Sequence, residues 1–157
     1  MKKFIALMAM LLVFAIPAKA DEKEDILGVI NQFFKAQKDR DAELWQEIML
    51  PDGVIMSHRE REGAPWVLTT RTAAGDLERL GTGDVVIDEI IYDPTVLVHK
   101  TIATVWAPYV IYVGERLLHC GIDNFHLFKV DGKWKISHFA YTTEPEGCEG
   151  LGLPPRE

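Results

Sequence analysis

Residues 102–142 read IATVWAPYVIYVGERLLHCGIDNFHLFKVDGKWKISHFAYT. Three runs rich in β-branched and aromatic residues, which favour strands, are separated by the pairs Gly114-Glu115 and Asp131-Gly132. Both pairs suit two-residue hairpin turns, because such turns need positive φ angles. This stretch therefore predicts a meander of three long antiparallel strands.

The second turn predicts which side chains share a face of the meander, because a hairpin turn fixes the register of its strands. If its two residues form the loop, Val130 lies opposite Lys133. Counting outward from that pair places Asp123 and His138 on the apolar face as diagonal neighbours, within reach of each other.

The first turn adds two side chains to the same face. Counted in the same way, it pairs Val110 with His119 and Trp106 with Asp123. Pro108 has no backbone N–H and usually marks an edge or a bulge, and a bulge would shift every earlier pair by one residue.

The first twenty residues predict a secretory signal peptide. A basic start at Lys2-Lys3 precedes an apolar run, Phe4–Ile16, and a small-residue end that predicts cleavage after Ala20. The apolar run is short for a membrane span, although an uncleaved anchor is the alternative. We therefore expect a periplasmic or secreted product, with no membrane association after cleavage.

The charge of the chain argues against a nucleic-acid partner. The whole sequence carries a net charge of −7, and removing a leader with three lysines and no acidic residue leaves −10. Such an acidic protein repels nucleic acids and anionic membranes.

The two cysteines, Cys120 on a predicted strand and Cys148 in the C-terminal region, are a candidate disulfide. An oxidising compartment would permit the bond. A plain buried cysteine at the centre of a strand is the alternative.

Helical periodicity predicts three helices before the meander. The first spans residues 24–38, the second is short and starts at residues 39–41, and the third spans residues 73–80 behind a threonine cap. A short strand over residues 54–58, a loop over residues 59–65 and a strand over residues 85–92 complete the prediction, and His99-Lys100 is expected to turn into the meander.

Helices that precede an antiparallel sheet are typical of the α+β class. We expect a cone-shaped, curved antiparallel sheet wrapped around the N-terminal helices. The predicted organisation is a signal peptide (residues 1–20), a single cone domain (residues 21–143) and an irregular C-terminal tail (residues 144–157).

Between residues 25 and 142 the sequence resembles the nuclear transport factor 2-like superfamily, and within it the SnoaL-like bacterial members. An N-terminal helix with Phe33-Phe34 and the turn at Pro51–Val54 carry part of the resemblance. Positions in the meander carry the rest: Ala103, Val105, Pro108, Tyr109, Gly114, His119, Cys120, Gly121, Asp123, Phe125, Leu127, Gly132, Trp134, Ile136 and Thr142.

The resemblance implies a curved cone with an internal pocket, often dimeric through the outer face of the sheet. The superfamily includes isomerases, dehydratases, epoxide hydrolases, polyketide cyclases and non-enzymatic binders, so the fold alone does not fix an activity. The arginine of the epoxide hydrolase members has no match on the apolar face of the meander, and the tyrosine of the steroid isomerase members has none on the first helix.

Asp123 and His138 are the candidate catalytic residues. A carboxylate beside an imidazole in an apolar cone can exchange protons near neutral pH, which would suit a lyase or an isomerase. The alternative is a buried pair that only orders the sheet. A metal site built from His58, His119, Asp123 and His138 is a weaker alternative, because no HxH or CxxC spacing supports it.

The leading hypothesis is a cofactor-free domain that binds a small apolar or aromatic molecule, and a surface that docks a partner is the further alternative. A collapsed cone filled by Phe33, Trp45 and Trp134 would favour the docking surface. The candidate ligand-binding residues line the expected pocket or its lid: Trp106, Tyr109, His119, His58, Trp66 and Phe125.

Overall fold

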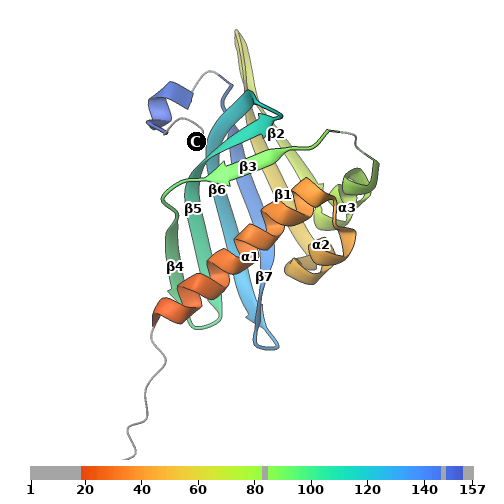
Figure 1. Cartoon of the computed structure of the whole chain (residues 1–157), viewed down its shortest axis with the longest axis vertical. Helices are drawn as coiled ribbons and strands as arrows, with labels where there is room; N and C mark the ends of the chain where they lie inside the picture. The colour runs from red at the N-terminus through yellow and green to blue at the C-terminus, as the bar shows by residue number, and fades with distance from the viewer. Residues whose placement is uncertain (1–18, 83–84, 146–147, 154–157) are drawn as a thin grey trace, which may run out of the picture.

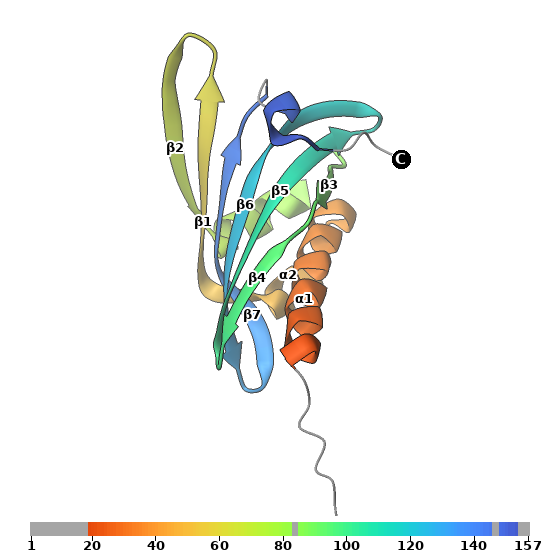
Figure 2. The ribbon, with the colours of Figure 1, turned by 90° about the vertical axis from the view of Figure 1, so that its left-hand side faces the viewer.

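Helix α1 (Lys19–Asp39) lies across the concave face of a curved sheet in the computed structural model, which describes residues 19–82, 85–145 and 148–153 (Figure 1). Seen from the side, α1 lies on one side of the sheet, and the hairpin of β1 (Met49–Arg61) and β2 (Ala64–Thr72) forms one edge of the sheet (Figure 2). The predicted leader falls almost entirely outside the described residues, and its cleavage point after Ala20 lies in the first turn of α1.

Two shorter helices follow α1 and cover the same side of the sheet. In α2 (Ala42–Ile48) the Asp41 side chain caps the first turn by accepting a hydrogen bond from the Leu44 N–H at 2.9 Å. In α3 (Ala73–Thr82) the Thr72 hydroxyl accepts from the Gly75 N–H at 3.1 Å. The three predicted helices are confirmed. Among the described residues, no helix is long and apolar enough to cross a membrane.

The sheet has seven strands. They are β1 (Met49–Arg61), β2 (Ala64–Thr72), β3 (Asp88–Ile91), β4 (Thr95–His99), β5 (Ile102–Val113), β6 (Arg116–Val130) and β7 (Lys133–Thr143). Their order is β2-β1-β7-β6-β5-β3, and β4 also pairs with β5. The α+β class and the curved sheet are confirmed, but the sheet is mixed, because β1 runs parallel to β7.

Strand β2 was not predicted. The expected loop over residues 59–65 is instead the end of β1, a tight turn with Gly63 at φ +64°, and the start of β2. Gly63 supplies the left-handed conformation that such a turn needs. The charged residues that suggest a loop lie on an exposed hairpin, where both faces accept polar side chains. Conversely, the predicted strand over residues 85–92 is strand only at Asp88–Ile91.

A bulge in β7 reverses the face of His138. The predicted pair Val130–Lys133 is confirmed, but Ser137 is an extra residue, so His138 pairs with His126 and not with Phe125. The Ser137 hydroxyl donates to the His126 carbonyl oxygen at 3.1 Å, so the extra residue is bonded to the neighbouring strand through its side chain. Because side chains alternate along a strand, every residue of β7 after Ser137 lies on the face opposite to the predicted one.

A second bulge, in β6, shifts the pairing of β6 with β5 and so places Trp106 of β5 on the outer face of the sheet instead of the predicted apolar face. Leu118 is the extra residue, so His119 pairs with Ile111, and Trp106 pairs with Asn124 instead of Asp123. Trp106 therefore lies on the outer face with half of its surface exposed (50%), whereas His119 stays on the concave side. The predicted pairs Val110–His119 and Trp106–Asp123 are wrong for this reason.

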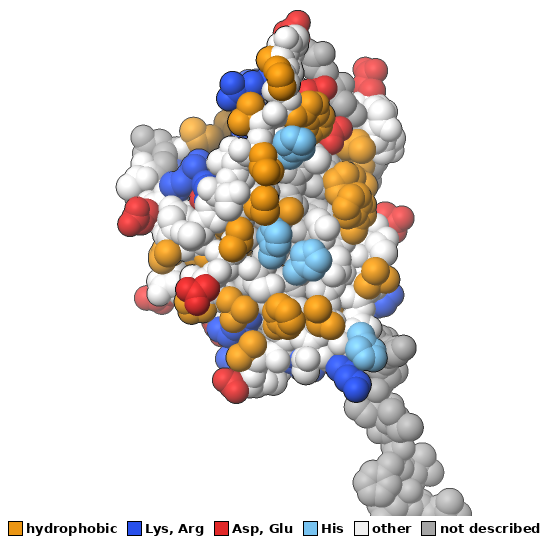
Figure 3. Space-filling model, turned by 180° about the vertical axis from the view of Figure 1, so that it is seen from behind, with side chains coloured by type: hydrophobic (Ala, Val, Ile, Leu, Met, Phe, Trp, Pro, Cys, Tyr) orange, Lys and Arg blue, Asp and Glu red, His pale blue; other side chains and the backbone are white. Residues whose placement is uncertain are grey.

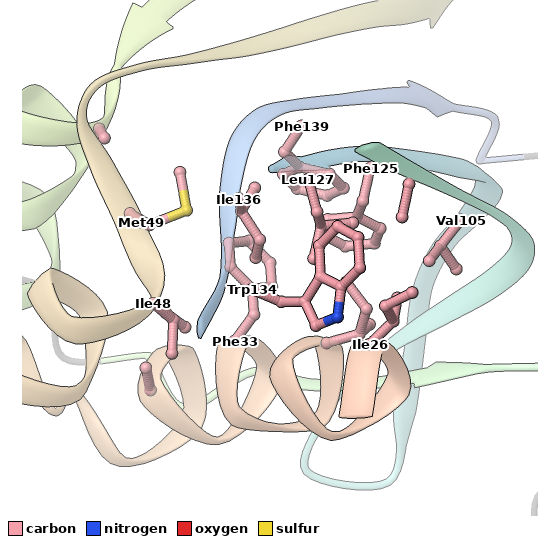
Figure 4. Packing of buried hydrophobic residues seen from close by; sticks show 14 of the residues in the cluster. Ile26, Phe33, Ile48, Met49, Val105, Phe125, Leu127, Trp134, Ile136 and Phe139 are labelled. Atoms are coloured by element: carbon pink, nitrogen blue, oxygen red, sulfur yellow. The ribbon is translucent and has the colours of Figure 1, made fainter. Parts of the chain in front are cut away.

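The concave side of the sheet is filled by aromatic and aliphatic side chains beneath α1 (Figure 4). Phe33 of α1 packs edge-on against Phe125 and Phe139, with ring centroids 5.2 and 4.9 Å apart, and these two rings stack on each other at 4.3 Å. Trp45 and Trp134 are buried in the same cluster. The apolar interior thus ties α1 to the middle of the sheet, and the space that remains lies toward the C-terminal end of α1.

The C-terminal residues are more ordered than expected. Cys120 and Cys148 form the disulfide that the sequence left open. A short 3-10 helix, η1 (Cys148–Leu151), follows, and Leu151 packs beside Val110 of β5 in a second apolar cluster. The tail therefore covers one end of the meander, and the prediction of a wholly irregular tail is wrong there.

Candidate functional site

A cavity of about 290 Å³ opens between the sheet and the three helices. This volume is close to the lower end of the range for small-molecule sites. Its apolar walls are Phe33, Trp45, Leu80, Val85, Ile87, Ile111, Leu118 and Phe139. Its polar lining residues are Gln37, Arg40, Arg71, Asp76, Arg79, Glu89, His119 and Tyr141.

Two acidic side chains from different strands meet beside this cavity. Asp123 of β6 is fully buried, and Glu89 of β3 lines the cavity wall, half-buried. The two carboxyl groups share a hydrogen bond. Because two ionised carboxylates cannot make this bond, one of them holds a proton. Apart from this bond, neither Asp123 oxygen has a partner in the described part of the chain.

Burial and mutual repulsion hold protons on this acid pair. Burial raises the pKa of Glu89 to about 7, although hydrogen bonds from Gln37 and Asp123 favour its ionised form. The pKa of Asp123 is raised well above its ordinary range, chiefly by burial and in second place by the charge of Glu89. Gln37 Nε2 donates to Glu89 Oε2 at 3.0 Å. Asp123 is therefore the donor of the pair, and Glu89 is the group that ionises first.

Behind the acid pair, Tyr109 of β5 and His119 of β6 form a second polar pair. The fully buried Tyr109 hydroxyl donates its proton to the Thr142 carbonyl oxygen at 2.6 Å. His119 Nδ1 lies 3.1 Å from the same hydroxyl and must then be the donor. The imidazole is neutral at pH 7, since burial and the charge of Arg59 lower the pKa of His119 to about 4. Its Nε2 atom therefore carries a lone pair.

A fork of hydrogen bonds fixes an arginine on the opposite wall. Arg71 of β2 binds Asp76 of α3 through both carboxylate oxygens, at 2.7 and 3.2 Å. Its Nη2 atom also donates to the Tyr141 hydroxyl of β7 at 3.2 Å. Bidentate pairs of this kind hold both partners in one geometry, so three elements of the cavity wall are joined rigidly.

The structure separates the predicted catalytic pair. Asp123 lies on the concave side, whereas His138 lies on the outer face beside His126, with ring centroids 5.7 Å apart. The Asp123–His138 acid/base pair is therefore wrong, and the cause is the bulge at Ser137. Glu89 takes the place that the sequence assigned to the histidine.

The other predicted site residues divide between the two faces. His119 lines the cavity, Tyr109 is buried behind it, and Phe125 belongs to the core below it. Trp106 lies on the outer face of the sheet. His58 and Trp66 contact each other on the outside of the β1–β2 hairpin, with ring centroids 4.9 Å apart. These last three are wrong as pocket residues.

The four residues of the weaker metal alternative do not converge. His119 and Asp123 lie on the concave side, and His58 and His138 lie on the outer one. Within residues 19–82, 85–145 and 148–153, no group of three His, Cys, Asp or Glu side chains is placed to hold a metal ion.

The sequence analysis missed Glu89, Gln37 and Arg71. Glu89 could have been found as an acid within the apolar run VVIDEIIY (residues 85–92), where alternation puts it on one face with Ile87 and Ile91. Arg71 was missed because it lies on the strand that was not predicted. It gives the concave side an arginine that the meander alone lacks.

Solved structures show what the chain resembles. It is similar to a nuclear transport factor 2-like protein of unknown function from Shewanella baltica, with 18% identity, a TM-score of 0.62, and coverage of 83% of this chain and 100% of that one. It is also similar to a nuclear transport factor 2-like protein with a cystatin-like fold from Novosphingobium aromaticivorans, with 13% identity, a TM-score of 0.66, and coverage of 87% of this chain and 91% of that one. A protein of unknown function from Mycobacterium tuberculosis has 18% identity to this chain and a TM-score of 0.65, and the match covers 80% of this chain and 78% of that one. No model of a protein family matches the chain, and no curated protein matches it either.

Proposed function

Because the chain has the nuclear transport factor 2-like fold, we propose that it binds a small, largely apolar molecule in the cavity beside α1. The observation that carries this proposal is the combination of aromatic and aliphatic walls with one buried, proton-holding acid pair. Small-molecule sites are typically lined in this way, with few polar groups that converge on one point.

The acid pair and the histidine would orient the ligand. When Glu89 is protonated it can donate a hydrogen bond to the ligand, and the lone pair of His119 Nε2 can accept one. A ligand with a polar group next to an apolar body can therefore satisfy both. Phe33, Trp45 and Phe139 would contact the apolar body and remove its surface from water.

The second candidate function is proton-transfer catalysis of the lyase or isomerase type. The observation that favours it is the pKa of Glu89, about 7, at the wall of a cavity. An acid–base group works best when its pKa lies near the working pH. Glu89 would exchange the proton with the ligand, and Asp123 would steady its charge through the shared hydrogen bond.

Native mass spectrometry of the gently purified protein tests the binding proposal. We expect a bound small molecule, seen as an added mass, that is lost when Ile111→Trp fills the cavity. Leu97→Trp is the matched control, because Leu97 is 66% exposed on β4 away from the cavity. A wild-type protein without the added mass, or an added mass that survives the filling variant, would contradict the proposal.

We also propose that the protein is exported. The predicted leader ends at Ala20, and a disulfide closes a separation of 28 residues between Cys120 and Cys148. Such bonds persist in the periplasm and outside the cell and are rare in the cytoplasm. The two features point to the same compartment.

We further propose that a second copy of the chain covers the outer face of the sheet. This face shows apolar and histidine side chains across its middle, and acidic side chains lie toward its edges (Figure 3). In the described strands, the outward positions between Val54 and His58 of β1 and those of β2, β4, β5, β6 and β7 carry no Asp or Glu, although the chain has 24 acidic residues. Glu60 lies beyond His58, near the tip of the β1–β2 hairpin. Two such faces can meet without the repulsion that the rest of this acidic surface would cause.

Trp106→Glu is expected to convert this dimer into a monomer at micromolar concentration. Trp106 is half exposed near the middle of the face, and a glutamate there would bury a charge in the interface. Sedimentation velocity measures the change. Val86→Glu is the control, since Val86 is exposed but lies outside the sheet. The same mass for wild type and Trp106→Glu would refute the proposed interface.

A further inference from the structure

We propose that the ligand of the cavity is an anion, a small carboxylic acid with an apolar or aromatic body, whose carboxylate is bound by Arg40 and Arg79 at the rim. This inference rests on the proposed binding function and narrows the class of ligand. It begins from the charges that line the cavity, which differ in sign from those of the protein as a whole.

Three arginines and two acidic residues line the cavity, in a chain whose net charge is −7. The acids are already compensated. Asp76 is bound by Arg71 through both of its oxygens. Glu89 shares a proton with Asp123, so this pair does not carry two negative charges. The cavity therefore keeps an excess of positive charge.

The excess belongs to Arg40 and Arg79. Arg40 lies where α1 turns into α2, and its Nη2 atom donates to the Val85 carbonyl oxygen at 3.0 Å, which fixes the guanidinium against the cavity wall. Arg79 lies on the exposed side of α3. In the described residues, neither arginine has an ion pair. Both guanidinium groups retain free N–H donors for an acceptor of matching shape.

Arg59 adds to this positive field from the sheet. It lies on β1, and its charge is one cause of the lowered pKa of His119. Arg59 also has no ion pair among the described residues. A carboxylate matches the planar fork of a guanidinium through two parallel hydrogen bonds, so an organic acid suits the rim better than a neutral molecule does.

The apolar walls decide where the rest of the ligand lies. With its carboxylate at the rim, the body of the ligand would extend into the cavity between Phe33, Trp45 and Phe139. A bare inorganic anion would leave these walls in contact with water. The arrangement therefore fits an amphiphilic acid and not phosphate or sulfate.

Two matched probes test the charge requirement on the full-length, mature protein. 2-Naphthoate and 2-naphthamide share one ring system and differ in charge, and Trp45 in the cavity wall reports binding of either through its fluorescence. We expect 2-naphthoate to bind about tenfold more tightly or better at low salt. Added salt should weaken the binding of 2-naphthoate only, because salt screens the interaction between its charge and the arginines.

Variants of the rim arginines locate the site. Arg79→Gln and Arg40→Gln are each expected to reduce the preference for 2-naphthoate by about threefold or more, and the double variant to abolish it. The affinity for 2-naphthamide should stay unchanged in all three. Arg61→Gln is the matched control, because Arg61 is exposed at the end of β1, where the chain turns into β2.

The outcomes separate this inference from the proposed function. Equal binding of the two probes, or a preference that survives the double variant, would overturn the anion inference and leave the binding function standing. If neither probe binds and inorganic phosphate also fails to, both proposals are wrong. Binding of phosphate alone would show a simple anion site and would likewise overturn the amphiphilic ligand.

Discussion

Replacing Gly121 with alanine is expected to lower the free energy of unfolding by about 3 kcal/mol. Gly121 lies on β6 opposite Tyr109, where the end of β7 approaches closely. A Cβ atom there would lie 2.8 Å from Thr142 Oγ1 and 2.9 Å from the Thr142 carbonyl carbon, and closer still to the carbonyl oxygen. That oxygen accepts the Tyr109 hydrogen bond, so neither strand can move away without breaking it.

Chemical denaturation of Gly121→Ala and wild type measures the difference. Gly28→Ala is the matched control, because a Cβ atom at Gly28 in α1 meets nothing within 4 Å. An alanine in the interior of a helix is more stable than a glycine by about 0.5–1 kcal/mol. The two variants should therefore shift stability in opposite directions. An equal effect at the two positions would show that the close approach of Thr142 is not important.

The free energy of unfolding of the wild-type protein is expected to fall by about 2 kcal/mol between pH 4.5 and 7 because Glu89 ionises. In Glu89→Gln this fall should be absent. The pKa of Glu89 is raised to about 7 in the folded protein, from an ordinary value of 4.5. Between these values the folded state binds more protons than the unfolded state, so the free energy of unfolding falls as the pH rises. A glutamine cannot ionise and keeps the shape of the side chain.

The measurement is the difference in unfolding free energy between Glu89→Gln and wild type, followed from pH 4 to 8. The difference is needed because the lowered pKa of His119 acts in the opposite direction, with stability rising from about pH 4 to 6.5. This histidine is present in both proteins, and its contribution cancels. The difference should grow in favour of the variant up to about pH 7. A flat difference would show that Glu89 ionises as it does in water.

The same variant distinguishes the enzyme from the binding protein. If the protein catalyses proton transfer, Glu89→Gln should lower turnover about a hundredfold or more, since general acid–base catalysis contributes that much. Binding of an aromatic acid should persist. Full turnover in the variant would exclude Glu89 as the group that transfers the proton and would leave the binding function.

Local signals in the sequence predicted much of the fold but little of the site. The turn at Asp131-Gly132 gave the correct pair Val130–Lys133, because a hairpin register is decided within a few residues. The bulge at Ser137 has no signature in composition, and one extra residue moved His138 to the other face. A prediction that depends on counting along a strand fails at the first bulge.

Glu89 shows a different limit of sequence reasoning. The four-residue strand β3 pairs with β5 across the antiparallel pair Glu89–Ile111, and no turn signal specifies that pairing. The meeting of Glu89 with Asp123 depends on it. Arg71 likewise reaches the cavity only through β2. Groups that come together through distant pairings cannot be assigned from local pattern alone.

The parallel pairing of β1 with β7 sets the order in which the chain can fold. Position 54 in β1 meets position 138 in β7, so this part of the sheet forms only after most of the chain is in place. Distant pairing of this kind slows folding, because the entropy of a long loop is lost before the contact forms. The meander of β5, β6 and β7 can nucleate through its own short turns. Until β1 joins it, the β1–β2 hairpin is an isolated two-stranded ribbon, which is only marginally stable in water.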